Sequence, residues 1–271
     1  MQTRQLSTRD NVRLAYVDTG GSGDPILALH GTFGRGRAWM TLADRLGPAW
    51  RVIGLDQRGH GLSDEPGEYG REAFLADAAD AIEALGIGPA VVVGHSLGAL
   101  NAYQLAARRP DLVRAFVAVD VPVEVGDFTN PWLDEFPERF PTLRALQLAI
   151  GEKVRGFGSV DHFQESAFED ERGWGFHWRP AAMHATKRGV IGTWWDDWTG
   201  SDQPALLVRG GDSPVVPLDH AMEMIERRPG TELVTVDGAG HDLYLTHHQE
   251  FGDAVSAFLS RIPTPLDAVA S

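Results

Sequence analysis

The sequence carries a Gly-x-Ser-x-Gly pattern at residues 94–98, with Ser96 at its centre. A short apolar run, 90–93, precedes it, and a helical pattern, 97–108, follows. Chemistry at such a serine needs a sharp strand-to-helix turn that lifts the hydroxyl above the edge of a sheet, and the two glycines leave room for it. The start of the helix adds positive potential where an oxyanion would form. We therefore expect Ser96 to be a nucleophile.

A serine hydroxyl is a weak nucleophile and needs a general base. His241 lies in a glycine-rich loop just after the apolar run 232–236, so a sheet strand can bring it over Ser96. Eight of the other nine histidines lie inside other motifs, in a turn, in the segment 122–199 or just before the last helical pattern. Chain order and loop position therefore favour His241 as the base.

The base needs a carboxylate that holds its tautomer and stabilises the imidazolium. Asp212 follows the apolar run 205–208, and the order Ser96, Asp212, His241 is the common order of such triads. Asp120, at the end of the run 112–119, is the alternative acid, although it could instead pair with backbone amides. We expect Asp212 to orient His241.

The elements that position these residues alternate along the chain. The predicted strands are 12–17, 26–29, 51–55, 90–93, 112–119, 205–208 and 232–236, and the predicted helices are 38–46, 72–85, 97–108, 218–227 and 249–259. Continuous apolar runs are typical of parallel strands that are covered on both faces. The pattern predicts an α/β fold with a doubly wound, mostly parallel sheet.

The alternation stops between residues 122 and 199, where no clear strand pattern is present. Six of the eight tryptophans lie there, at positions 132, 174, 178, 194, 195 and 198. We expect this segment to be an inserted, mainly helical cap. The core then comprises residues 1–121 and 200–262, and residues 263–271 form a C-terminal tail.

Several motifs resemble those of the α/β-hydrolase superfamily, in its esterase, haloperoxidase and C–C hydrolase branch. They are His30-Gly31, the stretch 56–64, the turn around Ser96, and Gly240-His241. The similarity covers residues 26–120 and 204–258 and leaves the expected cap out. It implies the α/β-hydrolase fold. The stretch 56–64 is assigned to loop architecture.

The resemblance also implies an oxyanion hole. Its donors would be the backbone N–H groups of Leu97 and of Thr32, the residue after His30-Gly31, with Phe33 as the alternative to Thr32. The spacing of Asp212 before Pro214 resembles the stress-regulator and strigolactone-receptor branch rather than many other relatives.

Composition and missing motifs exclude several other functions. The chain has 24 Lys and Arg against 38 Asp and Glu, a formal net charge of −14, which disfavours nucleic acid and anionic membranes as partners. It has no cysteine, which excludes disulfides and thiolate chemistry. Phosphate-loop and His-Glu-x-x-His motifs are missing, so we expect no cofactor and no metal. A serine at position 96 disfavours chemistry through an aspartyl ester.

We expect a cytoplasmic carboxylesterase that forms an acyl-enzyme, because residues 1–10 are polar and no apolar run is long enough to span a bilayer. The aromatic-rich cap predicts a small-molecule ester with an apolar acyl group. One alternative is lactone or C–C bond hydrolysis, or perhydrolysis, on the same triad. A slow-turnover ligand receptor is the alternative of another class. The sequence does not specify an oligomeric state.

Overall fold

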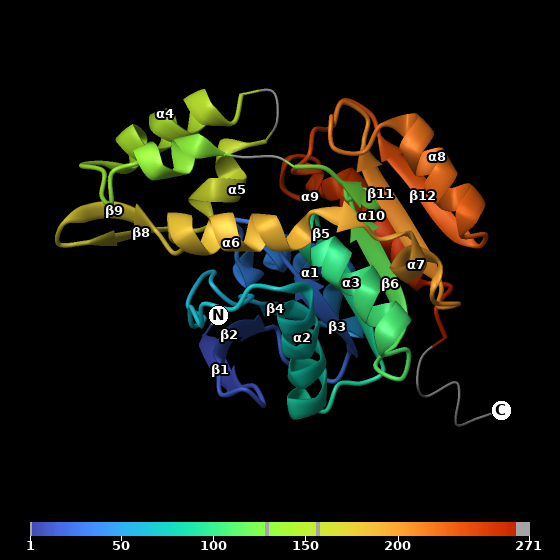
Figure 1. Cartoon of the computed structure of the whole chain (residues 1–271). Coiled ribbons are helices and arrows are strands. Elements are labelled where there is room, and N and C mark those ends of the chain that lie inside the picture. The colour runs from blue at the N-terminus through green and yellow to red at the C-terminus, as the bar shows by residue number, and fades with distance from the viewer. Residues whose placement is uncertain (1, 128–129, 156–157, 264–271) are drawn as a thin grey trace.

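A computed structural model describes residues 2–127, 130–155 and 158–263 of the chain (Figure 1). All but the first residue of the expected tail, 263–271, lies outside the described residues. An eight-stranded sheet forms the centre, in the order β1-β2-β4-β3-β5-β6-β11-β12. Its strands are β1 Thr3–Ser7, β2 Arg13–Asp18, β3 Asp24–Leu29, β4 Trp50–Leu55, β5 Ala90–His95, β6 Val113–Val119, β11 Ala205–Gly210 and β12 Thr231–Val236.

The strand directions agree with the expected doubly wound sheet. Strand β2 pairs antiparallel with both β1 and β4, and all the pairs from β4 to β12 are parallel. The sequence pattern missed β1, because its residues are exposed or half-buried and show no apolar run. A mostly parallel α/β sheet is confirmed.

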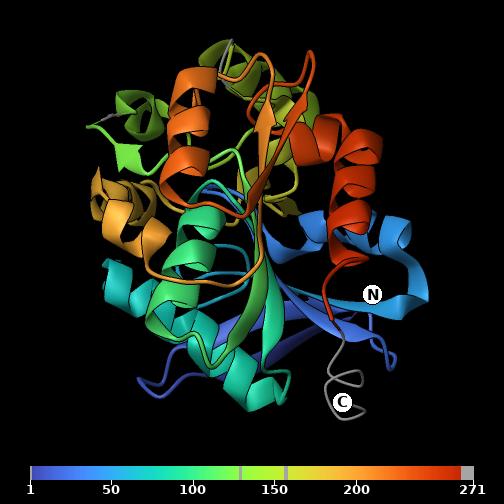
Figure 2. The ribbon, with the colours of Figure 1, turned by 90° about the vertical axis from the view of Figure 1, so that its right-hand side faces the viewer.

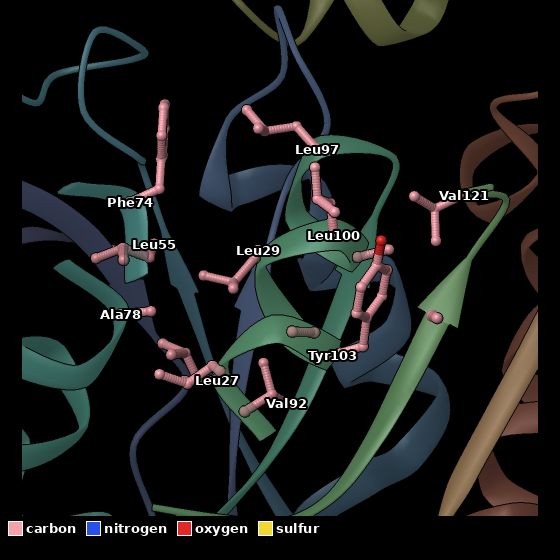
Figure 3. Close-up of a cluster of buried hydrophobic side chains, with 14 of the residues drawn as sticks. Leu27, Leu29, Leu55, Phe74, Ala78, Val92, Leu97, Leu100, Tyr103 and Val121 are labelled. Atoms are coloured by element: carbon pink, nitrogen blue, oxygen red, sulfur yellow. The ribbon is translucent and has the colours of Figure 1, made fainter. Parts of the chain in front are cut away.

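Helices cover both faces of the sheet, which explains the continuous apolar runs. Successive residues of β3 alternate between two cores: Leu27 and Leu29 belong to one, and Ile26 and Ala28 to the other. Figure 2 shows α2 (Arg71–Leu85) and α3 (Leu97–Arg108) on one side of the sheet, and α1 (Met40–Leu46) and α10 (His248–Leu259) on the other. Figure 3 shows side chains of the first core, among them Leu27, Phe74, Val92 and Leu100.

Most of the β6–β11 segment, residues 122–199, lies at one end of the sheet, whereas its last helix, α7 (Trp195–Thr199), lies beside α3 (Figure 1). Its helices are α4 Leu143–Lys153, α5 Val160–Gln164, α6 Pro180–Val190 and α7 Trp195–Thr199, with a 3₁₀ turn at Pro131–Glu135. Its strands are β7 Glu124–Val125, β8 Ala167–Asp170, β9 Gly173–Phe176 and β10 Gly192–Thr193. The segment is mainly helical, but β8 and β9 form an antiparallel hairpin that the sequence analysis did not predict.

Part of this segment belongs to the main core. Trp198 in α7 is fully buried, packs edge-on against Tyr103 and Phe116, and donates its Nε1–H to the carbonyl of Met224 at 2.8 Å. Its ring therefore supports the fold and takes no part in substrate contact. Among residues 2–127, 130–155 and 158–263, no helix is both long enough and apolar enough to cross a membrane.

Candidate active site

Ser96 lies at the turn between β5 and α3, with φ +49°. This left-handed conformation is uncommon for a non-glycine residue, and such residues concentrate at functional sites. A Cβ at Gly94 would lie 2.1 Å from the carbonyl oxygen of Gly98, and a Cβ at Gly98 would lie 2.1 Å from that of Leu29. Both glycines are therefore required for the turn that exposes the Ser96 hydroxyl.

His241 lies in the loop between β12 and α9 (Leu243–Thr246) and is buried. Its Nδ1 lies 2.7 Å from Oδ2 of Asp120. An ionised carboxylate only accepts hydrogen bonds, so Nδ1 carries the proton and donates it. A second contact fixes the loop, since Nε2 of His95 donates to the carbonyl oxygen of His241 at 3.0 Å.

Asp120 follows the last residue of β6 and is completely buried, with φ +47°. Besides His241, its carboxylate accepts from the backbone N–H of Gly210 at 3.0 Å and from the Ser213 hydroxyl at 2.5 Å. These contacts come from the end of β11 and the loop after it. They hold both oxygens of the carboxylate in one orientation.

Asp212 does not occupy the predicted position beside His241. Its side chain is exposed, and its backbone N–H donates to the carbonyl of Ala239 at 2.9 Å. The next residue, Ser213, is the one that turns inward and reaches Asp120. The expectation that Asp212 orients His241 is therefore corrected: the carboxylate in contact with the imidazole belongs to Asp120, the alternative acid.

The surroundings of His241 change its basicity. Burial alone lowers the pKa of the imidazole, but the hydrogen bond to Asp120, the charge of Asp120 and that of Asp242 together raise the pKa above 6.5. This is the behaviour expected of an imidazole that gains an anionic partner. The arrangement suits a group that must hold a proton taken from a neighbour.

The turn at residues 31–34 faces the start of α3 across the site, and Thr32, Phe33, Ser96 and Leu97 line the same cavity. Leu97 is the first residue of α3, so its N–H has no acceptor within the helix. Residues of the β6–β11 segment hold the turn from the other side. Nε2 of His162 donates to the Thr32 carbonyl at 2.7 Å, and the Ser166 hydroxyl donates to the Phe33 carbonyl.

His95, His162 and Asp242 are the described residues close enough together to be considered as metal ligands. Nε2 of His95 and Nε2 of His162 both point at backbone carbonyl oxygens, so both nitrogens carry protons. The Asp242 carboxylate accepts the backbone N–H of Ser159 at 2.6 Å. These hydrogen bonds connect the segment to the loop that carries His241.

A cavity of about 570 Å³ opens at Ser96 and His241. Its walls are mostly apolar and include Leu100, Val121, Trp132 and Phe163. Among the described aromatic side chains of the segment, Trp132 and Phe163 line the cavity, whereas Trp178, for example, stacks on Phe176 with ring centroids 4.5 Å apart. The cavity also contains two lysines, Lys153 and Lys187, which the sequence analysis did not assign to the site.

Residues 24–248 match the family described as the alpha/beta hydrolase fold. The chain belongs to the α/β-hydrolase fold family. This match includes Ser96, Asp120 and His241, and it agrees with the mostly parallel sheet.

The chain is similar to several named hydrolases. It is 33% identical to 2-(acetamidomethylene)succinate hydrolase of Mesorhizobium japonicum, over 82% of this chain and 82% of that protein. It is 32% identical to the sn-1-specific diacylglycerol lipase ABHD11 of Mus musculus, over 87% of this chain and 80% of that protein. The crystal structure of E-2-(acetamidomethylene)succinate hydrolase covers 96% of this chain and 99% of its own, with a TM-score of 0.82 and 28% identity. These relatives indicate a hydrolase that acts on a small molecule.

Proposed function

We propose that this protein is a serine hydrolase that cleaves a carboxylic ester through an acyl-enzyme, with Ser96, His241 and Asp120 as its triad. The observation that carries the proposal is the 2.7 Å contact between Asp120 and His241 beside a strained Ser96 turn. All three residues follow the carboxyl ends of strands in one sheet. That edge is where ligands bind in open α/β sheets.

In the proposed mechanism, Oγ of Ser96 attacks the ester carbonyl. Because Nδ1 of His241 donates to Asp120, Nε2 takes the serine proton and later gives it to the leaving alcohol. The N–H groups of Leu97 and Thr32 stabilise the oxyanion, with Phe33 as the alternative to Thr32. A water molecule, activated by the same imidazole, then hydrolyses the acyl-enzyme and restores Ser96.

We assign residues 122–199 as a cap over a core of residues 1–121 and 200–262. Support comes from the contacts of His162 and Ser166 with the turn at residues 32–33, and from the cavity walls that the segment supplies. Since those walls are mostly apolar, the body of the substrate is apolar.

Hydrolysis of a different bond on the same triad is the second candidate. The relative from Mesorhizobium japonicum is named for a substituted succinate rather than a simple ester, at 33% identity. Lactone hydrolysis and perhydrolysis use the same groups. The receptor alternative loses its sequence support, because it depended on Asp212 and the carboxylate beside His241 is that of Asp120.

A panel of p-nitrophenyl esters tests the proposal, with amide, lactone and C–C substrates alongside. We expect burst kinetics on the esters, labelling of Ser96 alone by a fluorophosphonate, and a loss of several orders of magnitude in kcat in Ser96→Ala. Thermal unfolding of Ser96→Ala should match that of the wild type. Near-normal ester turnover by the purified Ser96→Ala protein would overturn the proposal.

A further inference from the structure

Asp120 follows β6, but hydrogen bonds to β11 and its following loop hold it in place. The backbone N–H of Asp120 donates to the carbonyl oxygen of Val208 at 2.8 Å, and its Oδ1 accepts the backbone N–H of Gly210 at 3.0 Å. Its Oδ2 accepts the hydroxyl proton of Ser213 at 2.5 Å. The acid of the proposed triad is therefore attached to β11 and the loop after it at three points.

The direction of the Ser213 hydroxyl bond follows from its two neighbours. Ser213 is buried, with 6% of the residue exposed. The backbone N–H of Val215 donates to Oγ of Ser213 at 3.2 Å, so Oγ acts as an acceptor there. The carboxylate of Asp120 only accepts, so the single hydroxyl proton of Ser213 points at its Oδ2. Ser213 is therefore a donor to the acid.

Arg209 holds the loop that carries Ser213 and is itself 5% exposed. Its Nε donates to the carbonyl oxygen of Val216 at 3.0 Å, and its Nη2 donates to that of Gly211 at 3.3 Å. These two hydrogen bonds fasten the loop on both sides of Ser213. Ser213 is not among the described residues that line the cavity, so its route to the reaction is through Asp120.

Ser213 and His241 donate to the same oxygen of Asp120, at 2.5 Å and 2.7 Å. We propose that Ser213 is a positioning residue, whose hydroxyl holds Oδ2 of Asp120 at Nδ1 of His241 and shares the negative charge of that oxygen. The inference rests on the proposed function and adds a fourth side chain to its triad. A hydrogen bond with an ionised partner is stronger than one between neutral groups, which suits it to fixing a carboxylate.

Loss of the Ser213 hydroxyl should have two separate effects on His241. The Asp120 carboxylate would keep only the Gly210 N–H as a second donor, so it would be less firmly oriented and the rate should fall. Its Oδ2 would no longer be shared, so the negative charge would act more strongly on the imidazole. The pKa of His241, already raised above 6.5, should therefore rise further.

Ser213→Ala tests the proposal on a chromogenic ester. At the pH plateau, kcat should fall roughly 10-fold with KM little changed, the size expected for one hydrogen bond to a charged group. The acid limb of the profile of kcat/KM should move to higher pH, opposite to the shift expected for Asp120→Asn. Asp242 and His95 also lie beside the imidazole, and they stay the same in both variants.

Ser63→Ala is the matched control, because the two hydroxyl groups have the same kinds of partner. Oγ of Ser63 donates to the carbonyl oxygen of Asp56 at 2.5 Å and accepts the backbone N–H of Ala15 at 2.8 Å. Both substitutions therefore remove one donor and one acceptor. Thermal unfolding measures the loss of stability in each variant, but Ser63→Ala should keep the wild-type kcat and pH profile.

A double-mutant cycle shows whether Ser213 acts through Asp120. In the Asp120→Asn background, Ser213→Ala should change kcat by less than about twofold, because the charge that the hydroxyl orients is gone. An unmoved acid limb in Ser213→Ala, an equal effect in Ser63→Ala, or fully additive losses in the double variant would overturn the inference. Any of these results, with an inactive Ser96→Ala, would leave the proposed function intact, whereas turnover by Ser96→Ala would refute the proposed function itself.

Discussion

Oδ2 of Asp120 lies 2.7 Å from Nδ1 of His241, although the two residues are 121 positions apart in the chain. Strand β6 ends directly before Asp120 and pairs with β11, which in turn pairs with β12, the strand before His241. The acid and the base thus come from two strands with one strand between them. That intervening strand leads into Ser213, which donates to the same oxygen of Asp120.

Asparagine substitutions distinguish the two candidate acids. Asp120→Asn should lower kcat on the order of 10⁴-fold, because the amide cannot stabilise the imidazolium and can favour the wrong tautomer. Asp212→Asn should remain near the wild-type rate, since the Asp212 side chain is exposed. Steady-state kinetics on a chromogenic ester measure both, with thermal unfolding as the folding control. The opposite order of losses would return the acid to Asp212.

The pH profile of kcat/KM tests the environment of His241. The base acts in its neutral form, so kcat/KM should rise with pH and level off once the pH exceeds the pKa of His241, which lies above 6.5. Asp120→Asn removes the hydrogen bond and the charge of Asp120, which raise this pKa, and it leaves the charge of Asp242 and the burial that lowers the pKa. The residual activity of that variant should therefore reach its plateau at lower pH, while Asp212→Asn keeps the wild-type profile. An unchanged acid limb in Asp120→Asn would argue against the pairing.

Gly98→Ala tests the close packing of the turn. The added methyl group would lie 2.1 Å from the Leu29 carbonyl, so the strand or helix must shift, at a cost of about 1–3 kcal/mol or more in the free energy of unfolding. Gly151→Ala is the control. Gly151 lies within α4, its nearest neighbour would be Val160 Cγ2 at 3.5 Å, and alanine there should stabilise by up to about 1 kcal/mol. Urea denaturation measures both, and equal stability would contradict the tight turn.

The fold could be predicted because its evidence is local. Each buried strand of the sheet is a continuous apolar run, and the glycines at 94 and 98 are explained by contacts within a few ångströms of their own turn. The hairpin of β8 and β9 was missed because its strands are short and mostly half-buried, with no apolar run to mark them. Only tertiary packing reveals this hairpin, and the order of residue types along the chain does not show such packing.

The acid could not be chosen from the sequence because the argument from chain order applies equally to both candidates. Asp120 and Asp212 each lie between Ser96 and His241 in the chain, and each follows a strand of the same sheet. What decides is the direction of the side chains after β11: the side chain of Asp212 points outward, and that of Ser213 points inward to Asp120. The choice of the acid requires the distance between the side chains of Asp120, which follows β6, and His241, which follows β12.

The short strands β7 and β10 pair with each other and close the base of the β6–β11 segment, because Glu124 lies opposite Thr193. Just before β7, the Val123 carbonyl accepts the backbone N–H of Trp194, and its own N–H lies 3.3 Å from Nε2 of His220. The two ends of the stretch 124–193 are therefore held together. A chimera exchanged at these two points would keep Asp120, four residues before the crossover, beside His241, but it would lose the hydrogen bonds that His162 and Ser166 donate to the turn at residues 32–33. The cavity wall and the support of that turn would thus be inherited together.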